Sequence, residues 1–335
     1  MANKIKTKNY HTSLNILRFI IALAIIWYLF KQNIIDLSVF HYVFKNIPGL
    51  LLAILLCAGI IPIGAFRWWL LLRSQQCHIS LLSIYHIYAT ATLSNNLLPG
   101  AMGGDAVKAL YLLKYNALSR TKTIMSIVSD RIIGLLALLS LTFGLLLSQH
   151  NTLLTNQKFE LIFQVLFAFL LISILGIISI SLLSEIFLTK LTNKNITQNR
   201  TTNFLEALVF YKKSPLTVAI CLLIAVIMHS MLVASIILLA DIIDIKFLSS
   251  LEVAVASALS MIANIIPITP GGVGIGEASF EYICRMINNA NLGVAYGSVF
   301  LVFRITFLLS SLIGLYSFLV HRFDSEKDAH LIEKK

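Results

Sequence analysis

The chain has 335 residues, of which 58% are hydrophobic and only 12% are charged. An ordinary soluble domain is about half apolar and about one quarter charged, so this composition excludes a water-soluble globular protein. The net charge of +11 does not indicate a nucleic-acid-binding protein, because the basic residues lie in short loops between apolar segments. Charges placed in this way favour membrane orientation and contact with anionic lipid head groups.

Six apolar segments are each about as long as the roughly 20-residue helix that crosses a bilayer. They are Leu14–Phe30, Leu50–Leu72, Ile124–Leu147, Leu161–Leu183, Leu216–Leu239 and Leu292–Leu319. They predict an all-α polytopic membrane protein with about six full spans. The first segment follows several lysines, as in a secretory signal, but the absence of a small-x-small cleavage site after it favours an uncleaved span.

The expected organisation is a cytoplasmic tail over 1–13, a transmembrane domain over 14–320 and a second cytoplasmic tail over 321–335. The four cysteines are scattered in or beside apolar segments, with no Cys-x-x-Cys or Cys/His cluster. Neither a disulfide framework nor a metal site is therefore predicted. No cofactor is predicted either.

One further apolar segment, Leu81–Leu98, is long enough to cross the membrane but breaks the positive-inside pattern. A full crossing would place the basic residues between Lys108 and Lys122 outside. The conflict disappears if the chain turns back at Pro99-Gly100-Ala101-Met102-Gly103-Gly104 and returns as a half helix from Asp105 to about Leu118. Proline lacks a backbone donor and glycine adopts unusual dihedral angles, so this stretch predicts a re-entrant hairpin.

A second break, Pro267 to Gly276, follows the apolar segment Leu248–Ile268, and Glu277 begins the next half helix. If this segment is a hairpin that enters from the outer face, the last span runs inward. Most lysines and arginines then face the cytoplasm, and both termini lie there. We therefore expect a multi-pass protein of the bacterial inner membrane with two re-entrant hairpins.

The two breaks resemble each other, which predicts an internal repeat. Each contains an Asn-x-x-Pro, a Gly-Gly pair and an acid, and each is followed by an arginine inside an apolar span. Arg131 lies 26 residues after Asp105, and Arg304 lies 27 residues after Glu277. Because the hairpins are expected on opposite faces, we predict an inverted-topology repeat, an architecture common among secondary transporters.

The half-helix N-termini carry partial positive charge and unpaired N–H groups, so together with the two arginines they could form an anion site in the middle of the membrane. A phosphate is the predicted anion. The residues proposed for this binding are Arg131, Arg304, Gly103, Gly104, Gly271, Gly272 and Gly274. The acids proposed to orient the hairpins are Asp105 and Glu277. The residues proposed to break the helices are Asn96, Pro99, Asn264, Pro267 and Pro270.

Two structural alternatives stand beside this hypothesis. Gly and Pro in membrane helices are often simple packing points. The arginines could also pair with Asp105 and Glu277 and touch no substrate, although an acid can orient an arginine that also meets a ligand. Arg304 in particular should have a partner or line a wet cavity, because an unpaired charge in a span costs at least about 2.5 kcal/mol.

Other polar residues have simpler interpretations. His86 and His229 are expected to be hydrogen-bonded packing residues. Asp130 is expected to face the inner end of its span, and Arg67 is expected to be an interfacial anchor beside two tryptophans. Glu281 and Arg285 stand four residues apart and are expected to pair along one helix.

These motifs resemble those of the lysylphosphatidylglycerol synthase transmembrane, or flippase-like, family, over about Ile16 to Val320. The resemblance rests on the Asn95 to Asp105 stretch, the Ser129 to Gly134 segment and the Pro-Gly-Gly-Val-Gly-Ile-Gly-Glu-Ala form that ends at Ala278. It implies a protein that moves or handles lipids with polar or charged head groups. One departure is Gly276, where the family often has a basic residue, so head-group specificity does not carry over at that position.

In the resistance factors of this family, the membrane part is joined to a domain that transfers an aminoacyl group from charged tRNA to phosphatidylglycerol. The fifteen residues after Val320 are too few for such a domain, so no synthase activity is expected.

The leading hypothesis is a translocator of anionic, phosphate-bearing lipids. One alternative is a membrane-embedded enzyme that modifies a lipid or polyprenyl-phosphate head group, although the sequence has no Asp-x-Asp, His-Glu-x-x-His or P-loop motif. Another is a membrane partner of a separately encoded lipid-modifying enzyme, with the basic Ser184–Pro215 loop as its docking surface. No ATP site is evident, so transport would be driven by a gradient, by downhill flow or by a partner.

Overall fold

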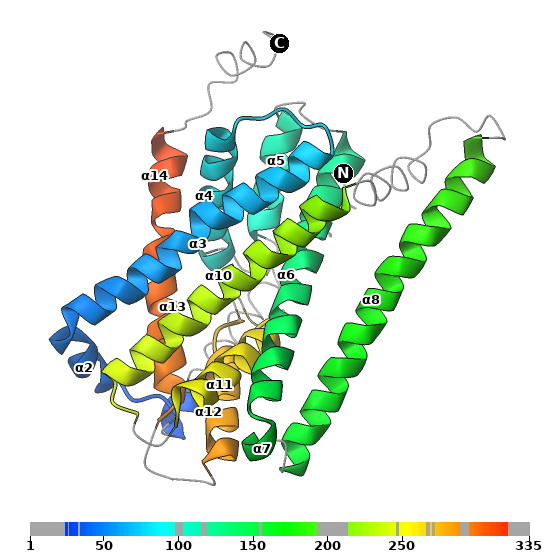
Figure 1. Cartoon of the computed structure of the whole chain (residues 1–335). Helices are drawn as coiled ribbons and strands as arrows, with labels where there is room; N and C mark the ends of the chain where they lie inside the picture. The colour runs from blue at the N-terminus through cyan, green and yellow to red at the C-terminus, as the bar shows by residue number, and fades with distance from the viewer. Residues whose placement is uncertain are drawn as a thin grey trace, which may run out of the picture. The chain divides into compact units, whose positions relative to one another are not determined.

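The computed structural model covers the whole chain and describes residues 24–25, 27–32, 34–97, 103–114, 119–153, 156–192, 214–245, 248–265, 269, 272–288 and 295–320. All regular secondary structure in these ranges is helical (Figure 1). The all-α class is therefore confirmed. The chain divides into two compact units, each built from three separate stretches of sequence.

Five stretches of helix are long and apolar enough to cross a membrane. They are α3 (Ile47–Ser74), α6 (Arg120–Ser148), the Gln157–Gly176 part of α8 (Gln157–Thr192), α10 (Pro215–Ile242), and α13 (Gly297–Ser311) continued by α14 (Ile313–Val320). They match five of the six predicted spans. The sixth, Leu14–Phe30, lies mostly outside the described residues, which show helix only at 24–25 and 27–31.

Both predicted breaks separate two helices. Helix α4 (Leu81–Leu97) precedes the first break and α5 (Gly103–Lys114) follows it, whereas α11 (Ser250–Ala263) and α12 (Ile275–Ile287) flank the second. At about 1.5 Å per residue, α5 and α12 are only about 18–20 Å long, shorter than the roughly 30 Å hydrocarbon core. That length fits half helices, whereas re-entry and inverted orientation stay predictions.

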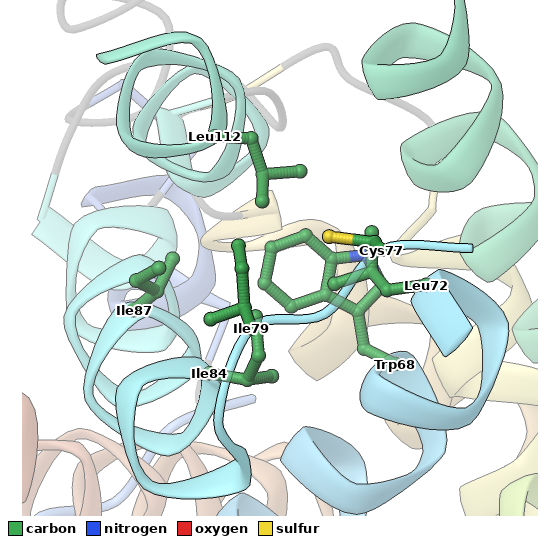
Figure 2. Packing of buried hydrophobic residues seen from close by; sticks show 7 residues of the cluster. All are labelled: Trp68, Leu72, Cys77, Ile79, Ile84, Ile87 and Leu112. Carbon is green, nitrogen blue, oxygen red and sulfur yellow. The ribbon is translucent and has the colours of Figure 1, made fainter. Parts of the chain in front are cut away.

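Unit 2 consists of Gly59–Ala91, Asp105–Met231 and Ile313–Lys335. Its first core cluster joins α3, the following loop, α4 and α5 around the fully buried Trp68 (Figure 2). The other members are Leu72, Cys77, Ile79, Ile84, Ile87 and Leu112. A second cluster joins α3, α6 and α10 through Leu71, Ile133, Ala137, Cys221 and Ala225. After the short α7 (His150–Leu153), α8 packs on α6, with Phe143 stacked on Phe163 and Phe167.

Unit 1 consists of Met1–Ala58, Thr92–Gly104 and Leu232–Leu312, and it contains α2 (Val39–Lys45), α11, α12 and α13. Helix α12 packs against both α11 and α13. Helix α11 begins with a capping box in which Ser249 and Glu252 exchange hydrogen bonds with each other's backbone. Its buried face is rich in alanine and serine, which permits close helix approach. This packing positions the start of α12 beside α13.

Candidate functional site

In unit 1, the predicted acid and arginine form an ion pair in which the acid is buried and the arginine is partly buried. Glu277 lies in the first turn of α12, and Arg304 lies on α13. Arg304 Nε donates to Glu277 Oε1 at 2.7 Å, and its Nη2 donates to Oε2 at 3.1 Å. The Glu277 side chain is 1% exposed and that of Arg304 is 20% exposed. This two-point contact fixes the guanidinium group more firmly than a single hydrogen bond would.

The same arginine also joins the two sides of the break. Its Nη2 donates to the Gly272 carbonyl oxygen at 3.0 Å and to Asn264 Oδ1 at 3.2 Å. Asn264 is the residue that ends α11, and Gly274 N–H donates to Glu277 Oε2 at 2.9 Å at the start of α12. The predicted site residues Asn264, Gly272, Gly274, Glu277 and Arg304 are thus brought together in one network.

Gly272 is required by the geometry of this network. Its φ is +70°, and a Cβ placed there would lie 2.1 Å from Asn264 Oδ1. A side chain would be strained by the dihedral angle and would also displace the asparagine that Arg304 contacts. The glycine motif therefore allows the break to close around the arginine.

In unit 2, the corresponding pair also forms, but nearer the surface. Arg131 Nε on α6 donates to Asp105 Oδ2 on α5 at 2.9 Å. The Arg131 side chain is 50% exposed and that of Asp105 is 19% exposed. The structural alternative, in which each arginine pairs with its acid, therefore describes the observed contacts. Ligand binding by the arginines stays a prediction.

The remaining predicted residues of the two breaks do not join such a network among the described residues. Gly103 begins α5, and Gly104 N–H donates to Asn95 Oδ1 at 2.8 Å, a contact within unit 1. Asn95, which was not among the predicted residues, therefore supports the helix start, and Asn96 lies one residue before the end of α4. The other predicted residues, Pro99, Pro267, Pro270 and Gly271, lie outside the described residues.

Sequence reasoning missed a buried charge cluster in unit 2, which we call the Asp130 cluster and define as Asp130, Arg67 and Lys108. Arg67 Nε and Nη2 donate to Asp130 Oδ1 at 3.1 and 2.8 Å, and Lys108 Nζ donates to Asp130 Oδ2 at 2.9 Å. All three side chains are at most 8% exposed. Three helices, α3, α5 and α6, are tied together by these contacts.

This cluster changes two expectations. Arg67, expected to be an interfacial anchor, and Asp130, expected to face the inner end of its span, are buried and paired with each other. Lys108 lies on the helix that was expected to start near Asp105, but its pairing with Asp130 was not predicted. The signal that could have found it was the presence of Arg67 and Asp130 within apolar spans, because charges there are expensive and need partners. Lys108 could have been added as the residue one helical turn after Asp105, on the half helix beside them.

The other polar residues largely follow their simple interpretations. His229 Nε2 lies 3.0 Å from the Gly134 carbonyl oxygen and makes a hydrogen bond between α10 and α6. Glu281 pairs with Arg285 along α12, as predicted, and also accepts from Gly297 N–H at the start of α13 at 2.8 Å. Both groups therefore hold helices together.

The family of the chain follows from its comparison with known proteins. A family model described as the lysylphosphatidylglycerol synthase TM region matches residues 15–314. No curated protein and no solved structure matches the chain. The family match covers most of the sequence and includes both breaks, both acid–arginine pairs and the Asp130 cluster. The chain therefore belongs to the family of the lysylphosphatidylglycerol synthase TM region.

Proposed function

We propose that this protein translocates lipids whose head groups carry a phosphate across the bacterial inner membrane. Membership of the family makes it a multi-pass membrane protein that associates with membrane lipids and is tied to lipid handling. Beyond family membership, we propose that the protein translocates lipids, that these lipids have anionic head groups, that it lies in the bacterial inner membrane and that both termini are cytoplasmic.

The observation that carries the proposal is an acid–arginine pair at a broken helix, which occurs in both units. In each, a short helix begins after a glycine-containing break with an acid in its first turn, and an arginine from the next apolar helix meets that acid. Ionisable groups inside apolar spans are costly, and in membrane proteins they frequently mark substrate paths. Two such pairs at two such breaks favour a transport function over simple packing.

The chemistry of each pair suits a phosphate-bearing head group. The acid holds the guanidinium group beside the start of a helix, where backbone N–H groups and the helix dipole attract anions. The side chain of Arg131 is half exposed, so a head group can approach the guanidinium group that Asp105 orients. The acyl chains would remain in the surrounding lipid, and transport would run down a lipid or ion gradient.

A reconstitution assay tests the proposal. The full chain is placed in proteoliposomes that contain fluorescent phosphatidylglycerol or phosphatidylcholine, and lipid movement is followed by quenching from outside. The Arg131→Gln, Arg304→Gln double variant should translocate phosphatidylglycerol roughly 10-fold to 100-fold more slowly, as expected for the loss of charged hydrogen bonds.

The matched control is Arg120→Gln, an exposed arginine at the start of the same helix as Arg131. It should move phosphatidylglycerol at the rate of the unmodified protein. Equal rates for the folded double variant and the unmodified protein would disprove the arginine site. No protein-dependent movement of either lipid would disprove the translocator function itself.

A further inference from the structure

The Asp130 cluster has two cations and one anion. Arg67 and Lys108 both contact the single carboxylate of Asp130, and the neighbouring Asp105 and Arg131 balance each other. Within the described part of unit 2, the cluster therefore carries one surplus positive charge. A surplus charge at a buried position is costly unless a further anion or a strongly polar group meets it.

Among the residues that the structure describes, the other groups in contact with the cluster supply no negative charge. Lys108 Nζ lies 4.8 Å from the centre of the Trp68 ring and 4.4 Å from that of the Tyr88 ring. These cation–π contacts hold the ammonium group and offset part of its cost, but an aromatic ring carries no net charge. Cys221 Sγ lies 3.6 Å from the carbonyl oxygen of Arg67, and His229 bonds the carbonyl oxygen of Gly134. The charge imbalance therefore remains.

One side of Arg67 faces a position without a side chain. Its Nε and Nη2 are directed to Asp130, whereas Nη1 lies beside Gly134 on α6. A Cβ added at Gly134 would stand 3.8 Å from Nη1, at ordinary contact distance. The glycine thus leaves room next to N–H donors that Asp130 does not use.

We propose that Arg67 and Lys108 form a phosphate-binding site in which Asp130 positions both cations. This inference rests on the proposed function and adds Arg67 and Lys108 to the head-group contacts in unit 2. A phosphodiester carries one negative charge, so its binding gives two cations and two anions, a balanced set. Its several oxygens can accept from Arg67 Nη1 and from Lys108 at once.

The test compares Lys108→Met with Lys108→Arg in the full chain. Lys108→Met removes the surplus charge and leaves the balanced Arg67–Asp130 pair, so the protein should stay folded. Lipids retained by the purified proteins from equal mixtures of phosphatidylglycerol and phosphatidylcholine are measured by native mass spectrometry. The preference for phosphatidylglycerol should fall roughly tenfold or more in Lys108→Met. It should stay largely intact in Lys108→Arg.

A second variant keeps every charge and fills the space beside Arg67. Gly134→Leu should also lower the phosphatidylglycerol preference. A further arm adds inorganic phosphate to the unmodified protein and records thermal melting. Stabilisation by inorganic phosphate without any preference between the two lipids would retain the site and overturn the lipid function.

The two ways of failing are distinguishable. If the unmodified protein prefers phosphatidylglycerol and both Lys108→Met and Gly134→Leu keep that preference, the site is wrong and the proposed function stands. If the unmodified protein shows neither a lipid preference nor stabilisation by inorganic phosphate, both the site and the proposed function are wrong. If Lys108→Met fails to fold, Gly134→Leu alone decides the site.

Discussion

The two units share a common framework and differ in what surrounds it. Each has a helix that begins after a glycine-containing break, an acid in its first turn and an arginine on the next apolar helix. Three residues after the acid, unit 2 has Lys108 and unit 1 has Phe280. Immediately before the arginine, unit 2 has Asp130 and unit 1 has Phe303.

These differences between corresponding positions give the two units different interiors. In unit 1, the rings of Phe280 and Phe303 lie 5.9 and 5.5 Å from that of Phe300, so the region beside the ion pair is aromatic and apolar. In unit 2, the corresponding positions join Arg67 in a charged cluster. The acid–arginine pair is thus the common structural element, and among the described residues beside the two pairs the surplus charge is found in unit 2.

The largest expected effect comes from Asp130→Asn. The change leaves Arg67 and Lys108 buried without a counterion, and breaking a buried ion pair costs about 3–5 kcal/mol. In unit 1, Phe303→Leu should cost only about 1–2 kcal/mol, because most of its apolar volume remains. The melting temperature in detergent, followed by tryptophan fluorescence, should therefore be well below that of Phe303→Leu in the Asp130→Asn variant.

The double variant Asp130→Asn, Lys108→Met tests the electrostatic cause. It leaves one unpaired cation where Asp130→Asn leaves two, so it should melt at a higher temperature than the single variant. If the double variant melts lower, loss of Lys108 packing outweighs charge relief. The description of the cluster as a charge imbalance would then be wrong.

The next largest effect is the destabilisation caused by removing the acid of each acid–arginine pair, which should depend on how deeply the pair is buried. Glu277 is 1% exposed and holds a backbone N–H as well as Arg304, so Glu277→Gln should cost about 3 kcal/mol or more. Asp105 and Arg131 are 19% and 50% exposed, so Asp105→Asn should cost at most about 1 kcal/mol. Added salt should reduce the difference in melting temperature between the unmodified protein and Asp105→Asn, since salt screens an exposed ion pair.

Equal losses in the two variants would contradict this ranking. They would mean that the Asp105–Arg131 pair becomes buried in the membrane, against the exposure seen in unit 2. Such a result would also weaken the proposal that a lipid head group approaches Arg131.

The sequence predicted what local patterns determine. Apolar runs of spanning length located five helices, and Pro/Gly stretches located both breaks, because these features depend on residues close in the chain. The pairs Asp105–Arg131 and Glu277–Arg304 could also be anticipated, since a charge within a span needs a partner and the repeat supplied one in each case.

The Asp130 cluster was missed because it depends on tertiary packing. Arg67 lies beside tryptophans, a composition typical of a membrane interface, and only the packing of α3 against α6 shows that it is buried. Lys108 was expected on the half helix after Asp105, but the sequence does not show that the packing of α5 against Trp68 and Tyr88 buries its ammonium group. Which of several charges becomes buried is set by three helices together.

The last prediction compares the change in stability when one glycine from each unit is replaced by alanine. Gly276 lies against Phe300, and an added Cβ would stand 2.2 Å from that ring. Phe300 is itself held between Phe280 and Phe303, so Gly276→Ala should destabilise the protein by about 1–3 kcal/mol. Gly134→Ala has room for its methyl group and lies inside a helix, so it should stabilise the protein by about 0.5–1 kcal/mol.

Opposite shifts in melting temperature would confirm that the aromatic core of unit 1 is tightly closed while α6 of unit 2 has space beside Arg67. A melting temperature lowered by Gly134→Ala would show that this space is already filled, and would remove the room that the phosphate site requires.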